Sequence, residues 1–471
     1  MKMLRAICLG LLVSLPAQAL DLPDLGESAR TTLSELEEVR VGREVMRQMR
    51  QHRDFVTDAE LGNYLNTLGE RLAASSAKPY LQLEFFAVRD PSINAFALPG
   101  GFIGVHTGLL TASRNESELA GVLAHEIAHV TQNHIARLVD SQRSSGLTTL
   151  AALAVAILAA RSNPEVAQAA VTTAQALSVQ SQLDFTRENE KEADRVGFQN
   201  LERSGYDPAG MASFFERLMT QSRFQDNSAP TYLRTHPLSH ERMADMQHRL
   251  TGLPYRQHQD SLEYTLLRAK LMAEEGEPQL ALQRFSALQR DRPDDEGALY
   301  GLIHAALRAG GTARAESAFR RLAGKADSPL VETLGARIDL AQGRGGPAID
   351  RLREAQTRFS AYKPLAYAYA DALLRGGRVG DAIAHLQNGL LTWPEDAQLH
   401  AQLAQARFAA GQPMEGHLAM AESYLQRDLP AAAMEQLQLA LKAGGGDFYT
   451  QSIVESRLRE LRQREQREAK R

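Results

Sequence analysis

The chain has 471 residues, of which 44% are hydrophobic and 23% are charged, and its formal net charge is −4 at pH 7. A disordered chain would be poorer in apolar residues, and a near-neutral charge gives no reason to expect nucleic acid as a partner. The single cysteine excludes an intramolecular disulfide and a cysteine-based zinc module, and the length suffices for two or three domains.

The first residues carry the three-part pattern of a secretory signal peptide. A basic start at residues 1–5 is followed by an apolar run from Ala6 to Leu15 and by the small-x-small site Ala17-Gln18-Ala19. We expect a cleaved signal peptide over residues 1–19, and a buried N-terminal helix is the alternative.

The next segments mix helix and strand patterns. Apolar residues recur at helical spacing in 36–49 and 61–72, which predicts two helices. Apolar and aromatic runs at 81–88 and 95–105 predict strands, the second broken by Pro99-Gly100-Gly101.

Residues 125–129, His-Glu-Ile-Ala-His, form the strongest chemical signal in the chain. Residues four apart lie on one face of a helix, so His125 and His129 can offer two imidazole nitrogens to one zinc ion. Glu126 lies where its carboxylate can reach a water beside the metal and act as the catalytic base. The apolar neighbours predict a buried helix, where polar residues without a ligand are costly, so a metal site is favoured over two surface histidines.

The position of a third metal ligand decides the type of site. A histidine six residues after His129 would suit one class of metalloproteases, but that position is Ile135, and His134 is one residue short of it. The alternative is a carboxylate from a second helix.

The segment 190–194, Glu-Lys-Glu-Ala-Asp, supplies such a carboxylate. Glu190 and Asp194 lie on one helical face, so Glu190 is the predicted third ligand, and the fourth position stays open for water or substrate. Asp194 would accept a hydrogen bond from a ligand histidine and fix its tautomer. Glu188 and Glu192 are expected to be solvated.

Residues 136–250 are helical in pattern and include an apolar run at 147–160. Fourteen residues are too few to span a bilayer, which needs about twenty. A buried helix is one interpretation, and a mobile lid or a surface that touches membrane or client protein is the other.

From about residue 262 the sequence repeats. Glycines recur every 33 or 34 residues, a small residue follows each by five positions, and a bulky one follows the first four small residues by four. The glycines are Gly276, Gly310, Gly343, Gly377 and Gly411. This period resembles the tetratricopeptide repeat and predicts helix pairs whose concave surface binds a peptide or a folded partner, whereas an alanine-rich bundle would lack the regular interval.

The repeat register slips after Gly411, because the next turn signal, Arg427-Asp428-Leu429-Pro430, comes early. The end of the chain, 446–471, is predicted to be a charged helical tail, solvated from Glu455 onward.

Three motifs together resemble the M48 family of zinc metallopeptidases. They are residues 92–101 (Ser-Ile-Asn-Ala-Phe-Ala-Leu-Pro-Gly-Gly), His125-Glu126-x-x-His129 and Glu190-x-x-x-Asp194. The resemblance implies one zinc ion, endopeptidase activity and a gluzincin-like α+β domain with a small sheet. The expected protein is mainly α, with this domain at 20–255 and a tetratricopeptide-type solenoid at 262–445.

The signal peptide and the repeats point within this family to bacterial periplasmic proteases that enhance β-barrel assembly. That resemblance implies a periplasmic location, misassembled outer-membrane proteins as substrates, and the outer-membrane β-barrel assembly machinery as a partner of the repeats. In the family, a histidine in a His-Pro segment such as His236-Pro237 lies near the site. His236 would donate to the oxyanion or bind zinc as an inhibitory fourth ligand, and a surface loop histidine is the alternative.

Two function classes follow from these features. The first is a zinc endopeptidase that degrades stalled outer-membrane proteins, with an extended substrate added as a strand beside residues 94–105. A strand already paired on both sides would exclude that binding mode. The second class is a repeat-based chaperone or scaffold with a latent protease.

Overall fold

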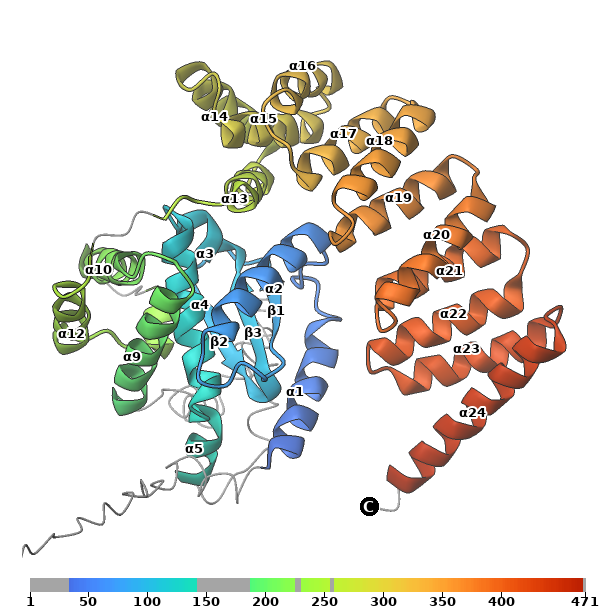
Figure 1. Cartoon of the computed structure of the whole chain (residues 1–471), viewed down its shortest axis with the longest axis horizontal. Helices are drawn as coiled ribbons and strands as arrows, with labels where there is room; N and C mark the ends of the chain where they lie inside the picture. The colour runs from blue at the N-terminus through green and yellow to red at the C-terminus, as the bar shows by residue number, and fades with distance from the viewer. Residues whose placement is uncertain (1–33, 142–186, 225–229, 255–257, 469–471) are drawn as a thin grey trace, which may run out of the picture.

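The computed structural model describes residues 34–141, 187–224, 230–254 and 258–468. The chain forms a mixed α and β part up to residue 254 and a curved array of helix pairs from residue 262 onward (Figure 1). The predicted signal peptide and the apolar run at 147–160 lie outside the described residues. No helix in the described ranges is long and apolar enough to cross a membrane.

The elements of the first part are α1 (Glu35–Met49), α2 (Ala59–Ala74), β1 (Glu84–Val88), β2 (Ala95–Leu98), η2 (Pro99–Gly101), β3 (Phe102–His106), α3 (Thr107–Ala112), α4 (Glu116–Thr131), α5 (His134–Ser141), α9 (Arg187–Arg203), α10 (Ala209–Phe224), α11 (Thr231–Thr235) and α12 (His240–Leu250). The helices of the array are α13 (Leu262–Glu274), α14 (Pro278–Asp291), α15 (Glu296–Arg308), α16 (Thr312–Ala323), α17 (Pro329–Ala341), α18 (Gly345–Arg358), α19 (Lys363–Arg375), α20 (Val379–Thr392), α21 (Ala397–Ala409), α22 (Pro413–Gln426), α23 (Pro430–Ala443) and α24 (Phe448–Glu468). A mainly helical chain with one small sheet confirms the predicted fold class.

The sheet has three strands in the order β1-β3-β2. β3 pairs parallel with β1 and antiparallel with β2. The predicted strand at 95–105 is therefore two strands, because Gly100 and Gly101 between them have φ values of 78° and 84°, which glycine adopts readily. As a result β3 is paired on both sides, whereas β2 is an edge strand of the sheet as described.

The helix that carries residues 125–129 is buried on every side. All residues of α4 except Val130 are buried, and α4 packs against α2, α9, α10 and β2. Gly197 of α9 allows a particularly close approach, since a Cβ at that position would lie 3.0 Å from the backbone nitrogen of His125. The backbones of α4 and α9 therefore lie against each other where the predicted ligands are.

The helix pairs of the array confirm the predicted repeat. All five turn glycines have φ values between 63° and 76°, and each joins two consecutive helices. The small residues and the bulky residues that follow them are buried between the helices. They are Ala281, Ala315, Ala348, Ala382 and Gly416, with Phe285, Phe319, Leu352 and Leu386.

The expectation of a solvated tail from Glu455 onward is wrong for Leu458 and Leu461 of α24. Val454, Leu458 and Leu461 are buried in an apolar cluster with side chains of α22 and α23. Their spacing of four and three places them on one helical face. Charged residues fill most of the other positions from Glu455 to Glu468. The early turn predicted before Pro430 is present, with Asp428 in the left-handed conformation at φ 59°.

The array is joined to the first part by a buried cation. The Lys270 ammonium of α13 lies 2.5 Å from Asp58 and 2.8 Å from Glu60, at the start of α2. Glu60 also accepts a hydrogen bond from the Thr333 hydroxyl of α17. Two helices of the array therefore meet the same end of α2.

A second junction lies at the first residue of α4. The Glu116 carboxylate accepts hydrogen bonds from the Tyr64 hydroxyl at 2.8 Å and from the backbone and hydroxyl of Ser261 at 2.8 and 2.7 Å. Nε2 of His258 lies 3.5 Å from the same carboxylate. The segment that leads into the array is thus attached to the helix that carries residues 125–129.

Candidate metal centre

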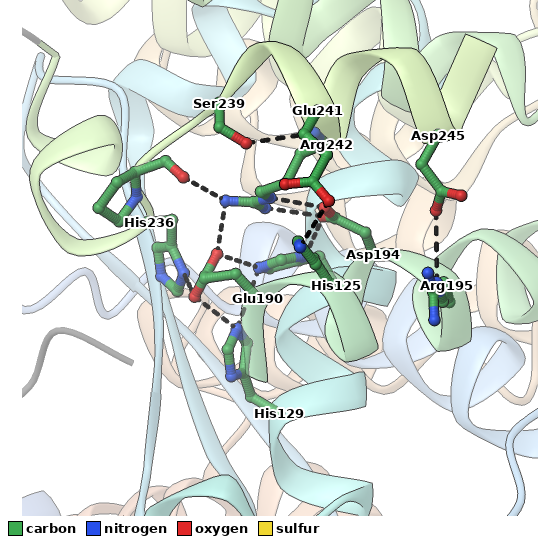
Figure 2. Close-up of polar contacts among 12 residues, drawn as sticks. His125, His129, Glu190, Asp194, Arg195, His236, Ser239, Glu241, Arg242 and Asp245 are labelled. Atoms are coloured by element: carbon green, nitrogen blue, oxygen red, sulfur yellow. Dashed lines mark hydrogen bonds and ion pairs between the residues drawn. The ribbon is translucent and has the colours of Figure 1, made fainter. Parts of the chain in front are cut away.

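The three predicted metal ligands meet between α4 and α9 (Figure 2). The Nε2 atoms of His125 and His129 are 3.0 Å apart. Oε2 of Glu190 lies 3.4 Å from Nε2 of His125, and Oε1 lies 3.4 Å from Nε2 of His129. Donors bound tetrahedrally at about 2.0–2.2 Å from a zinc ion are about 3.3–3.6 Å apart. The three side chains thus stand close to the separations that a zinc site requires.

His236 belongs to the same group. Its Nδ1 is 3.0 Å from a Glu190 oxygen, and one ligand atom from each of the four residues lies within 4.8 Å of the others. The ring is buried and stacks on Tyr232, with centroids 4.7 Å apart, and Tyr232 in turn packs on Phe215. This burial excludes the interpretation of His236 as a surface histidine.

Glu126 is fully buried beside this group. Neither of its carboxyl oxygens has a hydrogen-bond partner among the described residues, and Nε2 of His236 lies 3.5 Å from Oε1. Burial raises the pKa of Glu126, and the nearby His236 and His125 only partly oppose this effect. An unpartnered buried carboxyl is costly to the fold, so its presence here indicates a role in chemistry.

Asp194 and Arg242 contact the candidate ligands on the side away from the group of ligand atoms. Asp194 Oδ1 is 3.1 Å from Nδ1 of His125, as the sequence predicted for a carboxylate that fixes the histidine tautomer. Arg242 donates from Nε and Nη2 to Asp194 at 2.6 and 2.7 Å, and its Nη1 lies 2.8 Å from Glu190 (Figure 2). Nη1 also donates to the carbonyl of Pro237, next to His236.

Sequence reasoning missed Arg242. The only signal in the sequence was its spacing, because Arg242 precedes Met243 directly and Met246 by four residues and so lies beside apolar side chains in α12. Its partners lie about fifty residues earlier in the chain, so the pattern of α12 could not name them.

The ionisation of the group suits a metal cation. Burial lowers the pKa of His129 to about 3, so this imidazole is neutral. Burial acts to raise the pKa of Glu190, but the three histidines outweigh it and hold the pKa well below its usual range. For His125, burial is outweighed by the hydrogen bonds that the ring donates to Asp194 and Glu190, which raise its pKa to about 9, so metal binding would displace a proton from this ring. The carboxylates thus attract positive charge, and a neutral imidazole with an ionised carboxylate is the form that binds metal.

One expectation about the neighbouring acidic residues needs correction. Glu188 is exposed as expected, but Glu192 is not simply solvated. Its carboxylate accepts a hydrogen bond from Arg137 at 2.9 Å and lies 3.1 Å from Nε2 of His134. His134 was excluded as a ligand because it is one residue short of the position that a third histidine would need. That spacing gave no information about its contact with Glu192.

Comparison with known proteins agrees with the geometry. Residues 60–250, which include every residue of the site, match the model of peptidase family M48. The chain belongs to the M48 family of metallopeptidases. Over 451 residues it is 34% identical to the Beta-barrel assembly-enhancing protease of Escherichia coli K12, which covers 95% of this chain and 92% of that protein.

Two further relatives show how far the similarity extends. The Beta-barrel assembly-enhancing protease of Yersinia pestis is 34% identical over 413 residues, 87% of this chain and 85% of that protein. Mitochondrial metalloendopeptidase OMA1 of Schizosaccharomyces pombe is 32% identical over 184 residues, 39% of this chain and 51% of that protein. The predicted membership of the M48 family is confirmed.

Proposed function

We propose that this protein is a periplasmic zinc endopeptidase that degrades misassembled or stalled outer-membrane β-barrel proteins and assists their assembly. The observation that carries the proposal is the buried convergence of His125, His129 and Glu190 beside the unpartnered carboxyl of Glu126. The substrate class is supported by similarity, over nearly the whole chain, to proteases named for enhancing β-barrel assembly. The periplasmic location is supported by the signal-peptide pattern at residues 1–19.

In this proposal one zinc ion per chain is held by His125, His129 and Glu190. The ion supplies Lewis-acid chemistry, which makes water more acidic and polarises a peptide carbonyl. Glu126 takes a proton from the attacking water and delivers it to the leaving amine. Asp194 and Arg242 keep His125 and Glu190 in the orientation that binding requires.

We assign His236 an inhibitory role as a fourth ligand. Its Nδ1 lies 3.0 Å from a Glu190 oxygen, and one of its ring nitrogens belongs to the group of four ligand atoms, so the ring would compete with water or substrate for a bound metal. For substrate to enter, the segment around Pro237 must move, and His236 could then donate to the oxyanion from its displaced position. The carbonyl of Pro237 is held by Arg242, which favours the closed arrangement.

Substrate binding is assigned to the free edge of β2. This strand pairs with β3 on one side, packs against α4, and has no strand partner on its other side within the described residues. An extended chain added there would be held by main-chain hydrogen bonds with little sequence preference, as unfolded clients require. The array would bind the outer-membrane β-barrel assembly machinery.

The substitution Glu126→Gln tests the catalytic part. It should lower the cleavage of an unfolded outer-membrane protein at least about 100-fold, because the proton acceptor is lost. Zinc content, measured by elemental analysis of the purified protein, should not change because the ligands remain. A wild-type protein that cleaves without metal, or a variant that cleaves at the wild-type rate, would contradict the proposal.

The same variant separates the protease from the scaffold alternative. If cells that carry Glu126→Gln assemble outer-membrane proteins as well as the wild type does, the repeats carry the function and the protease is secondary. If assembly fails while stalled outer-membrane proteins co-purify with the variant, the endopeptidase hypothesis is supported and these substrates can be identified.

A further inference from the structure

The second histidine of the site is supported by another histidine. His129 and His134 are both fully buried, and their Nδ1 atoms are 2.9 Å apart. α4 ends just before His134, and Asn133 between them has a φ of 54°, a left-handed conformation that asparagine tolerates. The sharp turn at Asn133 returns the chain so that the first residue of α5 faces the ring of His129.

This contact allows only one arrangement of protons when His129 binds a metal. Its Nε2 is the atom that faces His125 and Glu190, so Nε2 must be free of hydrogen and Nδ1 must carry the proton. Nδ1 then donates to Nδ1 of His134, which makes that atom an acceptor. The proton of a neutral His134 must therefore be on Nε2, which lies 3.1 Å from a Glu192 oxygen.

Glu192 is in turn held in place. Its carboxylate accepts a hydrogen bond from Arg137 at 2.9 Å, and Arg137 also donates to Asn189 at 2.6 Å. The side chain of Glu192 is 37% exposed, so this end of the chain of contacts touches solvent while His134 does not. His134 should therefore have the larger effect on the metal and Glu192 the smaller.

Each of the two histidines of α4 is thus backed by a carboxylate of α9. His125 has a carboxylate directly behind it, Asp194, whereas His129 has a carboxylate one residue further away, Glu192 behind His134. Both carboxylates come from α9, which also supplies Glu190. A carboxylate that fixes the orientation and tautomer of a ligand histidine increases metal affinity.

We propose that His134, supported by Glu192, is a positioning residue that holds His129 in the orientation and tautomer that bind the metal. The inference rests on the proposed zinc site, and it gives a role to a histidine that the spacing of the ligand motif leaves unused. His134 itself does not touch the metal, because both of its ring nitrogens face other side chains.

The test compares His134→Leu with His134→Asn in the full chain. Leucine fills the space but cannot accept the proton of His129, whereas the asparagine oxygen can take the place of the accepting Nδ1. We expect His134→Leu to weaken zinc binding about 10–100-fold, measured by competition with a chromophoric chelator, and His134→Asn to recover most of that loss. Glu192→Gln should weaken binding about tenfold or less. The exposed His248 gives the matched control, and His248→Leu should bind zinc as the wild type does.

The visible spectrum of the cobalt-substituted protein gives a second readout, because it should change in His134→Leu and return towards the wild type in His134→Asn. Thermal unfolding of the metal-free variants shows whether each is folded. If His134→Leu does not fold, the Asn and Gln variants still decide the question through their zinc affinity. Equal zinc affinity in wild type and folded His134 and Glu192 variants would overturn the positioning role. A wild-type protein that binds no zinc would instead overturn the proposed function.

Discussion

Arg242 connects three features of the site at the scale of single residues. Its guanidinium contacts the proposed ligand Glu190, the carboxylate Asp194 behind His125, and the carbonyl of Pro237 beside His236. A planar group with donors in fixed directions can make these contacts at once, which a lysine ammonium cannot do with the same geometry. One side chain therefore links the ligand helix to the segment that would have to move when substrate enters.

Removing this guanidinium should destabilise the metal-free protein strongly. Arg242→Ala leaves two buried carboxylates without their cation, which is expected to lower the free energy of unfolding by about 3–5 kcal/mol. Arg242→Lys should lose less, because the charge remains although the two-point contact with Asp194 does not. The free energy of unfolding in urea, with a chelator present, measures both effects.

Arg249 supplies the matched control. It pairs with Asp245 in the same helix at 3.0 Å, and both side chains touch solvent. Arg249→Ala should cost less than about 1 kcal/mol, as partly exposed pairs usually do. Equal losses for Arg242→Ala and Arg249→Ala would show that the buried contacts do not stabilise the fold in the way described.

At the scale of elements, the separation of α4 and α9 sets the positions of the proposed ligands His125, His129 and Glu190. Gly197 makes their close approach possible, since a Cβ there would lie 3.0 Å from a backbone nitrogen and 3.1 Å from a backbone carbonyl of α4. These are atoms of a buried helix and cannot rotate away as a side chain could. The absence of a side chain at residue 197 is thus a condition for the metal centre.

Gly197→Ala should therefore impair both stability and metal binding. Overpacking of this kind costs about 1–3 kcal/mol, and the displacement of α9 should carry Glu190 away from the histidines and weaken zinc binding. Gly62→Ala in α2 is the control, because a Cβ at that position meets nothing within 4 Å and alanine is the better helix former, by about 1 kcal/mol. A Gly197→Ala protein with wild-type stability and zinc affinity would contradict the close packing.

The limits of sequence interpretation are also clearest at this scale. The repeat could be predicted because glycine turns and small residues recur at one period. The pairing of the His125 and His129 side chains could be predicted because their spacing matches a helical turn. The roles of Arg242, His134 and Glu192 could not, because each depends on which side chain of another helix lies opposite. The buried face of α24 could have been predicted, since Val454, Leu458 and Leu461 have helical spacing. The many charged residues around them favoured a solvated helix instead.

At the scale of the whole molecule, one apolar cluster runs from the first part of the chain into the array, and buried polar contacts add to it. Lys270 is 4% exposed and faces Asp58 and Glu60 across the junction. Burial acts to raise the pKa of Asp58, but the attraction of Lys270 outweighs it and lowers the pKa. Burial acts to lower the pKa of Lys270, and the two carboxylates outweigh it and raise that pKa.

These shifts predict how the stability of the junction depends on pH. Because the pKa of Asp58 is lowered on folding, its contribution is present above the unfolded value of about 3.9 and is lost as the pH falls through the folded value. The raised pKa of Lys270 keeps its contribution in place up to about pH 10. Lys270→Met should therefore lower the free energy of unfolding by about 2–3 kcal/mol near neutrality, somewhat less than the loss of a partner from a fully buried pair. Below about pH 4 the loss should be smaller, because Asp58 becomes protonated.

Thermal unfolding of wild type and Lys270→Met across pH 3–9 measures this difference. Lys325, which pairs with Asp294 on the surface of the array, provides the control, and Lys325→Met should show no measurable loss at any pH. A difference between wild type and Lys270→Met that stayed constant down to pH 3 would exclude Asp58 as the titrating partner.

The contacts of Glu116 bear on how the two parts of the protein can be studied separately. A chain cut before residue 258 would keep Tyr64 but lose Ser261 and His258 as partners of a buried carboxylate in the first turn of α4, nine residues before His125. Such a shortened protein could lose activity because its active-site helix is no longer anchored, even if the repeats took no part in recruiting substrate. Substitutions on the concave face of an intact chain would therefore report on recruitment, whereas deletion of the array would not.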